Sequence, residues 1–217
     1  MSDLSQTLLD KIFQAQSVDG MPPTEPMVPY KNIGDLLEQQ ADTYEQKAFL
    51  IFYAEDGHRK EYSYREFFEE VCRTANYLQS VGIRIGDRIA TVSHNHSDVV
   101  IQYFAAFMLG AVVVPVNVSE DDKRIAYILQ NSQAELAFVR DEFVERICGI
   151  RCEAPGLKTI VQVGKKPKPD LPHLQTELVM QPLRFKPAKR PHLSDEALIV
   201  YTSGTTGFPK GVVLLQY

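Results

Sequence analysis

The residues with the clearest potential for chemistry lie near the end of this 217-residue chain. The stretch YTSGTTGFPKGVVL, residues 201–214, places three glycines, four Ser or Thr side chains and one lysine between two apolar runs. Glycines let backbone N–H groups turn toward one point and let an anion approach closely. Hydroxyl donors and a lysine charge favour the same kind of ligand. The stretch therefore predicts a loop that binds phosphate.

The spacing within this loop excludes the two commonest nucleotide motifs. A Walker A loop needs four residues between its glycines and Ser or Thr after the lysine, whereas two residues separate Gly204 from Gly207 and Gly211 follows Lys210. The G-x-G-x-x-G pattern of dinucleotide-binding folds is absent. Pro209 restricts the backbone beside the lysine. The remaining alternative is an exposed glycine-rich turn with an incidental lysine, which the density of hydroxyl groups disfavours.

Two smaller groups of residues have metal-ligating side chains. His94 and His96 flank Asn95 after an expected strand, and they could share a ligand, but no third ligand has matching spacing. Cys148 and Cys152 are four residues apart, without a second ligand pair nearby. We expect a loop that faces a site for the histidines and an idle thiol pair for the cysteines. Neither group predicts a metal.

The elements that must position the loop alternate regularly between strand and helix. Expected strands lie at 48–53, 88–93, 111–116, 136–140, 159–163 and 196–201, and expected helices at 32–40, 63–81, 119–131 and 142–150. Ser63 and Glu66 form a capping box, and an apolar stripe from Tyr64 to Val81 follows. The pattern predicts an α/β fold, a mostly parallel sheet with helices on both faces.

One apolar stretch requires a test for membrane insertion. Residues 99–116 carry no charge over 18 positions, the lower limit for a spanning helix. Gly110 and Pro115 divide the stretch, so we expect a buried helix followed by a buried strand and no transmembrane segment. The amino terminus carries Asp3 and Asp10 and resembles a short amphipathic helix with a docking role rather than a signal peptide.

Composition restricts the partners and the compartment. The chain is 44% hydrophobic and 24% charged, which is typical of globular proteins, and its net charge of −5 gives no reason to expect nucleic acid. Three cysteines suit a reducing compartment, so we expect a cytoplasmic protein. Peripheral contact with a membrane stays open.

The loop YTSGTTGFPKGV resembles the signature of the adenylate-forming (AMP-binding) superfamily, which includes acyl-CoA synthetases. The upstream stretches ANYLQSVGIRIGD and GAVVVPVN resemble the amino-terminal subdomain of that family, so the resemblance covers residues 33–214. It implies a fold of the acyl-CoA synthetase type and an ATP-dependent acid–thiol ligase. In such an enzyme a carboxylate attacks the α-phosphate of ATP, and coenzyme A then takes the acyl group. It implies that the β- and γ-phosphates are held, with Mg²⁺, by Thr202, Ser203, Gly204, Thr205, Thr206, Gly207 and Lys210, with Lys210 as the catalytic residue.

The resemblance also predicts what this chain does not contain. Family members are more than twice as long, and their adenine, ribose and Mg²⁺ ligands and late catalytic lysine would lie beyond Tyr217. We therefore expect an amino-terminal fragment of a fatty acid–CoA ligase that does not complete catalysis and that self-associates. The alternative is a non-catalytic half-fold that senses nucleotides or binds a partner. The expected divisions are an amino-terminal helix and Pro-rich lead (1–30), an α/β subdomain (31–163), a Pro-rich crossing segment (164–193), and the strand and loop (194–217).

Overall fold

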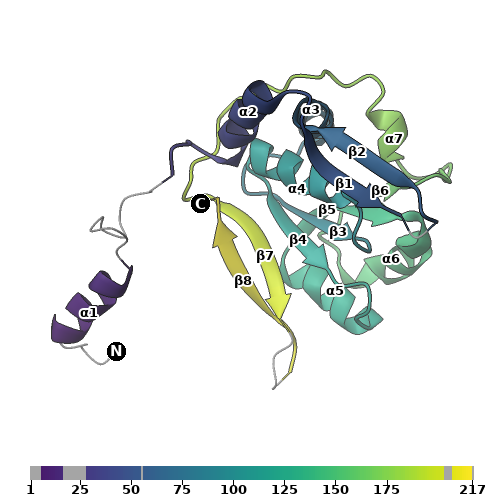
Figure 1. Ribbon diagram of the computed structural model, residues 1–217. Helices are drawn as coiled ribbons and strands as arrows, with labels where there is room; N and C mark the ends of the chain where they lie inside the picture. Colours follow the sequence, from purple (N-terminus) through teal and green to yellow (C-terminus); the bar gives the residue numbers. More distant parts are fainter. Residues whose placement is uncertain (1–5, 17–27, 55, 203–206, 217) are drawn as a thin grey trace.

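The computed structural model describes residues 6–16, 28–54, 56–202 and 207–216 (Figure 1). Its centre is a six-stranded sheet in the order β6-β5-β3-β4-β7-β8. The strands are β3 (Arg88–Val92), β4 (Val112–Val116), β5 (Ala134–Arg140), β6 (Thr159–Val163), β7 (Glu196–Thr202) and β8 (Lys210–Leu215). The first five run parallel, and β8 pairs antiparallel with β7 at the edge. A separate antiparallel hairpin joins β1 (Ala48–Tyr53) and β2 (Arg59–Ser63).

Helices cover both faces of this sheet, which confirms the predicted fold class. One core is formed by α2 (Ile33–Tyr44), α3 (Tyr64–Ser80) and α4 (Ser97–Leu109) against one set of strand residues. The opposite core is formed by α5 (Asp122–Asn131) and α6 (Val144–Ile150) against the alternate residues. On β3, for example, Ile89 belongs to the first core and Ala90 to the second. This alternation is the period of two that side chains follow along a strand.

Local sequence signals place α3 and α4 as predicted. The Ser63 hydroxyl accepts the backbone N–H of Glu66, and the Glu66 carboxylate accepts the N–H of Ser63, so the expected capping box begins α3. The apolar stretch at 99–116 is α4 followed by β4, as expected, and both are largely buried. Within the described ranges, no helix combines the length and apolar character needed to cross a bilayer.

Four features differ from the sequence expectations. Helix α5 begins at Asp122, with Asp121 as its N-cap, three residues later than expected. Helix α3 ends at Ser80, so Val81 lies outside the apolar stripe and is 44% exposed. The crossing segment contains one short helix, α7 (Leu174–Glu177). The largest difference is β8, a strand that the sequence reading treated as part of the loop and its trailing apolar run. Helix α1 (Gln6–Gln16) forms, and its docking role stays a prediction.

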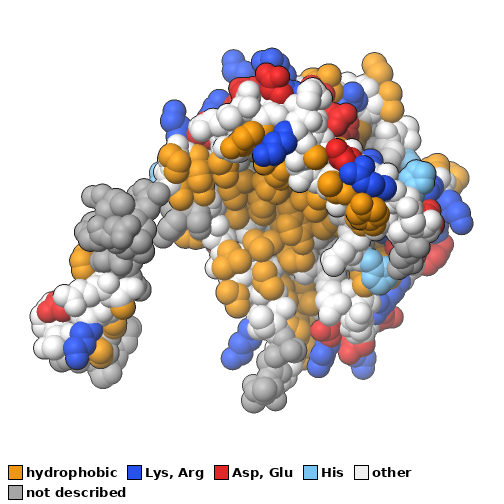
Figure 2. Space-filling view, in the orientation of Figure 1, with side chains coloured by type: hydrophobic (Ala, Val, Ile, Leu, Met, Phe, Trp, Pro, Cys, Tyr) orange, Lys and Arg blue, Asp and Glu red, His pale blue; other side chains and the backbone are white. Residues whose placement is uncertain are grey.

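The β7–β8 hairpin leaves apolar side chains at the surface. All six residues of β8 are exposed, and Figure 2 shows apolar atoms gathered over this hairpin and beside it toward α4. The exposed apolar residues of β8 are Val212, Val213, Leu214 and Leu215. The expected apolar surface is therefore present, and self-association through it stays a prediction.

Candidate functional site

The predicted phosphate loop connects the two strands of the β7–β8 hairpin. Thr202 is the last residue of β7 and Lys210 is the first residue of β8, and the two are partners across the antiparallel pair. The hairpin therefore brings these two predicted site residues together at the base of the loop. The other predicted residues at 203–206, Ser203, Gly204, Thr205 and Thr206, lie outside the described residues.

The described part of the hairpin has donors that suit an anion. The Lys210 side chain is exposed, and its ammonium forms no ion pair with a carboxylate of the described residues. Gly207 has φ of 147°, a conformation that favours glycine, so the turn before Lys210 requires this residue type. An unpaired ammonium beside a hydroxyl and a glycine turn fits a phosphate chain.

Gly211 has a packing role within the β7–β8 hairpin. It lies within β8 opposite Tyr201, and a Cβ atom there would lie 2.9 Å from Ile199 Cγ2 and 3.2 Å from Tyr201 Cζ. The missing side chain therefore makes room for two side chains of β7. That an anion also approaches the backbone of Gly211 stays a prediction.

A cavity of about 400 Å³ lies next to the hairpin, at the carboxyl ends of the central strands. Its wall from the hairpin is Val200 and Tyr201, and its other walls come from the ends of β3 and β4 and from α4. The polar lining residues are Thr91, Ser93, His94, Asn95, Tyr103, Asn117, Ser119 and Tyr201. Ligands of open parallel sheets bind at this edge, where the strand order changes direction. Here β4 and β5 lie on opposite sides of β3.

Asn117 and Ser119 are site-lining residues that the sequence reading did not single out. The Asn117 side-chain oxygen accepts the N–H of Ser119 at 3.0 Å, which forms a tight turn directly after β4. The sequence signal that could have identified them is a polar residue directly after a buried strand. Such a residue lies at the carboxyl end of the sheet, where His94 and Asn95 were already expected.

Aromatic contacts attach the hairpin to α5. The ring of Phe208, at the end of the loop, stacks on Tyr127 with centroids 4.6 Å apart and planes 23° apart. The Tyr201 hydroxyl donates to Asn131 Oδ1 at 2.7 Å. Burial, with a smaller contribution from Tyr127, raises the pKa of Tyr201 and keeps its hydroxyl protonated as a donor. These contacts hold the described part of the hairpin against α5.

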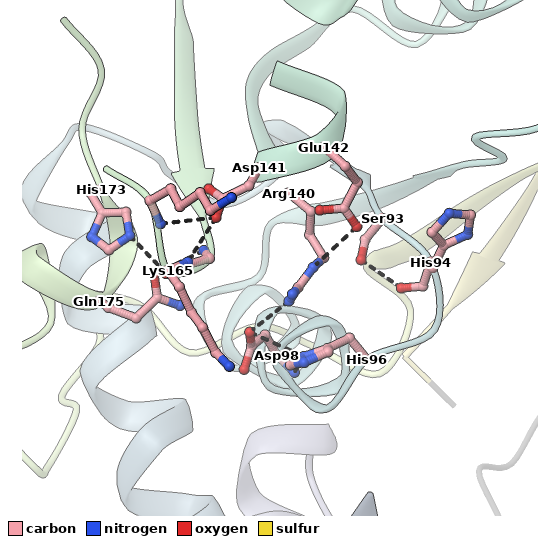
Figure 3. Close-up of polar contacts among 12 residues, drawn as sticks. Ser93, His94, His96, Asp98, Arg140, Asp141, Glu142, Lys165, His173 and Gln175 are labelled. Carbon is pink, nitrogen blue, oxygen red and sulfur yellow. Dashed lines mark hydrogen bonds and ion pairs between the residues drawn. The ribbon is translucent and has the colours of Figure 1, made fainter. Parts of the chain in front are cut away.

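The two histidines after β3 lie in different surroundings. His94 lines the cavity beside the hairpin and contacts the Phe143 ring at 5.1 Å between centroids. His96 is the N-cap of α4, and its Nδ1 lies 3.1 Å from both the backbone nitrogen and the carboxylate of Asp98 (Figure 3). The neutral ring accepts the N–H, and the protonated ring donates to the carboxylate. The two side chains therefore have different neighbours, and a ligand shared between them stays untested.

Asp98 is the centre of a partly buried charge cluster. Arg140 Nη1 donates to the Asp98 carboxylate at 3.2 Å, and Arg140 Nε lies 3.7 Å from the exposed Glu142 carboxylate (Figure 3). Burial by itself raises the pKa of Asp98, but the hydrogen bond from His96 and the charges of His96, Lys60 and Arg140 outweigh it. The pKa of the Asp98 carboxyl is therefore below its ordinary value.

Metal-ligating side chains and thiols are dispersed over the described structure. No group of three His, Cys, Asp or Glu side chains in the described ranges could hold a metal ion. Cys148 and Cys152 are exposed and Cys72 is buried, all three as free thiols. Burial raises the pKa of the Cys72 thiol to about 12, which leaves it unreactive near neutral pH.

Comparison with known proteins identifies relatives of nearly the whole chain. The family described as AMP-binding enzyme matches residues 37–216. The crotonobetaine/carnitine–CoA ligase of Salmonella paratyphi A is 34% identical over 192 residues, which is 86% of this chain and 37% of the relative. This chain thus spans little more than a third of that relative's length.

Solved structures agree with the sequence relatives. The anthranilate–CoA ligase AuaEII, solved with anthranoyl-AMP, is 28% identical with a TM-score of 0.79, over 88% of this chain and 36% of that one. A fatty acyl-CoA synthetase from Mycobacterium tuberculosis is 29% identical with a TM-score of 0.71, over 85% of this chain and 34% of that one. Together with the family match, they show that this chain belongs to the AMP-binding enzyme family, as an amino-terminal part of its adenylate-forming fold.

Proposed function

We propose that this chain is the amino-terminal part of an ATP-dependent carboxylate–CoA ligase that acts through an acyl-adenylate. The observation that carries the proposal is the β7–β8 hairpin, which places Lys210 opposite Thr202 at the base of a glycine- and hydroxyl-rich loop. The hairpin stands at the carboxyl edge of a parallel sheet, beside a cavity of about 400 Å³. Its relatives named above are CoA ligases, which supports this reading over an unrelated nucleotide-binding protein.

In the proposed reaction the hairpin binds the part of ATP that leaves. A carboxylate oxygen of the acid attacks the α-phosphorus, a new C(=O)–O–P bond forms, and the bond to the β-phosphate oxygen breaks to release pyrophosphate. Negative charge grows on that oxygen, and the Lys210 ammonium, the Thr202 hydroxyl and the N–H groups of the loop are proposed to stabilise it. The residues proposed for this role remain Thr202, Ser203, Gly204, Thr205, Thr206, Gly207 and Lys210.

The acid and the acceptor follow from the substrate chemistry that the relatives share. The relatives are named for crotonobetaine or carnitine, anthranilate and fatty acyl substrates, so a carboxylic acid is their common substrate chemistry. We propose a fatty acid as the acid and coenzyme A as the acceptor. Mg²⁺ supplies charge neutralisation for phosphoryl transfer in general. We assign no residue of this chain to it, because the described residues offer no metal cluster.

A second candidate is a non-catalytic half-fold that senses nucleotides or binds a partner. Both helical layers are packed onto the sheet over two closed cores, although the chain covers only 37% of the relative. A body that folds in this way could function without the remaining domain. Whether an adenylating activity accompanies a longer form of this protein discriminates the two candidates.

The test of the main proposal is ATP–pyrophosphate exchange by a longer form of the gene product, with a panel of carboxylic acids. We expect exchange with at least one acid, and a loss of about 10²–10³-fold for Lys210→Ala, because one preorganised cation is removed from the transition state. Lys186→Ala, an exposed lysine of the crossing segment, is the matched control and should retain activity. Absence of exchange with every acid would contradict the ligase proposal.

The 217-residue chain itself should bind ATP weakly and release no acyl-adenylate. Its hairpin provides donors, but an exposed Lys210 in water gains little from one phosphate contact. Isothermal titration calorimetry checks this expectation. Micromolar ATP binding that disappears in Lys210→Ala would show that the chain alone forms a complete nucleotide site and would favour the sensing candidate.

A further inference from the structure

A second cavity, of about 290 Å³, lies on the other side of the carboxyl edge of the sheet. Its walls come from the β1–β2 hairpin, the N-terminus of α4, the end of β5 and the turn after β6. The cavity has no lining residue in common with the cavity beside the β7–β8 hairpin. None of the described residues proposed to bind pyrophosphate lines this cavity.

Three cations from three separate elements line this cavity. Lys60 lies on β2, Arg140 is the last residue of β5, and Lys165 follows β6. Figure 3 shows the Arg140 and Lys165 side chains directed toward Asp98 from different sides. The ammonium groups of Lys60 and Lys165 form no ion pair with any carboxylate in the described ranges. Lys60 Nζ instead lies 4.6 Å from the centroid of the Tyr62 ring.

The acids of the cavity do not balance this charge. Among the described lining residues, the carboxylates are Asp56, which is exposed, and Asp98. Asp98 is already bound by Arg140 and contacts His96. The described lining residues therefore carry three cations against two carboxylates, an excess of one positive charge. The nearby Asp141 carboxylate accepts the backbone N–H groups of Lys165 and Lys166 and is engaged there.

The remaining walls suit a small anion. Helix α4 has 13 residues and begins at this cavity, so the positive end of its dipole adds to the lysines. His58 and His96 are further lining groups with ring nitrogens, and the His96 ring is held against Phe52 at 4.5 Å between centroids. A volume of about 290 Å³ is at the small end of ligand sites. The Lys165 ammonium, which forms no ion pair in the described ranges, and the Lys60 ammonium, which is hydrogen-bonded to Tyr62, both favour an anionic ligand.

We propose that this cavity binds a phosphate group, either as inorganic phosphate or as the phosphate of a small phosphorylated molecule. Lys60 and Lys165 contact the phosphate oxygens from opposite walls. Arg140 is held in place by Asp98 and contributes charge from the floor. The site is independent of the pyrophosphate grip and stands whether or not the ligase proposal is correct.

The test follows backbone amide shifts of the ¹⁵N-labelled 217-residue chain during titration with inorganic phosphate at constant ionic strength. We expect saturable shifts at the amides of Lys60, Asp98 and Lys165. Lys165→Gln should weaken this binding about tenfold or more, because a charge-assisted hydrogen bond is lost. Lys166→Gln is the matched control: it removes an adjacent exposed lysine that does not line the cavity, and it should leave the binding unchanged.

Lys210→Gln separates this site from the hairpin and should also leave the shifts at Asp98 and Lys165 unchanged. Parallel titrations with glycerol phosphate and inorganic phosphate distinguish the two sources of the phosphate by their relative affinities. The proposal is overturned if phosphate shifts only amides of the β7–β8 hairpin, if no shift saturates at millimolar phosphate, or if Lys165→Gln and Lys166→Gln weaken binding equally.

Discussion

The central strands and the β7–β8 hairpin belong to one sheet but are held in very different ways. On β3, β4 and β5 nearly every side chain is buried, and alternate residues enter the two cores. On β8 every side chain is exposed. The difference shows that the central strands are stabilised by the two helical layers packed on them. The β7–β8 hairpin, which carries the proposed phosphate site, extends from these strands and its outer strand buries little surface.

A few specific contacts compensate for the lack of burial at the hairpin. Gln216, directly after β8, is 1% exposed; it donates to the carbonyl of Phe107 at 2.9 Å and accepts the N–H of Ile33 at 3.3 Å. At the other end, Phe208 stacks on Tyr127. The hairpin is therefore tied at its base and near its tip, and its middle depends on strand pairing.

The largest expected effect contrasts one leucine from each region. Leu136→Ala on β5 removes a side chain that is 1% exposed, and we expect a loss of about 2–5 kcal/mol in the free energy of unfolding because a core cavity remains. Leu214→Ala on β8 changes a side chain that is 47% exposed, and the free energy should change by about 0.5 kcal/mol or less. Urea unfolding followed by circular dichroism measures both.

Similar losses for the two variants would mean that the hairpin is as well packed in solution as the central strands. That result would remove the distinction in stability between the central strands and the β7–β8 hairpin. An unchanged dependence on urea concentration in both variants is required, because it shows that the comparison reports stability rather than a change in the unfolded state.

The same contrast explains which parts of the fold the sequence could predict. The strands at 48–53 and 159–163 have the expected bounds, and the capping box of Ser63 and Glu66 forms as expected. In these elements, apolar periodicity and local capping agree with the tertiary packing. The carboxyl edge was predictable as well, because polar residues directly follow buried apolar strands.

The hairpin was harder to predict because its residues both pair as strands and belong to the predicted phosphate loop. KGVVLL lacks the alternation of a half-buried strand, so β8 was not recognised, although it pairs residue by residue with β7. Gly211 also has a packing requirement, because the Tyr201 ring crosses it closely, and only the pairing register reveals this. The Asp98 cluster joins residues 42 positions apart and leaves no local pattern.

An intermediate effect is expected at the Asp98 cluster, which lies on the scaffold. Asp98→Asn should lower the free energy of unfolding near neutral pH by about 1–3 kcal/mol, because Arg140 loses a charged partner in a partly buried position. The pKa of Asp98 is lowered in the folded state, so its contribution is complete above the ordinary carboxyl value of about 3.9 and is lost as the pH falls below it. Unfolding curves between about pH 7 and 3 measure this.

The difference between Asp98→Asn and the unsubstituted protein should therefore shrink toward the acid end of the series. Glu142→Gln is the control, because Glu142 is a more exposed partner of the same arginine, at 3.7 Å, and an exposed pair contributes about 0–1 kcal/mol. A constant difference at all pH values would contradict the electrostatic explanation and indicate lost packing instead.

The smallest expected effect concerns the stack that joins the tip of the hairpin to α5. Phe208 is 61% exposed, so Phe208→Ala should change global stability little, but it removes an aromatic pair that contributes about 0.5–1.5 kcal/mol. The amides of β8 should then exchange with solvent about 2- to 10-fold faster, since local opening of the strand becomes easier. Phe208→Tyr keeps the ring and should retain the slower exchange. Equal exchange in all three proteins would show that strand pairing, Gln216 and the Tyr201–Asn131 hydrogen bond hold the hairpin without the stack. Faster exchange confined to β8 in Phe208→Ala would show that the stack adds to these contacts in positioning the hairpin that carries the proposed phosphate site.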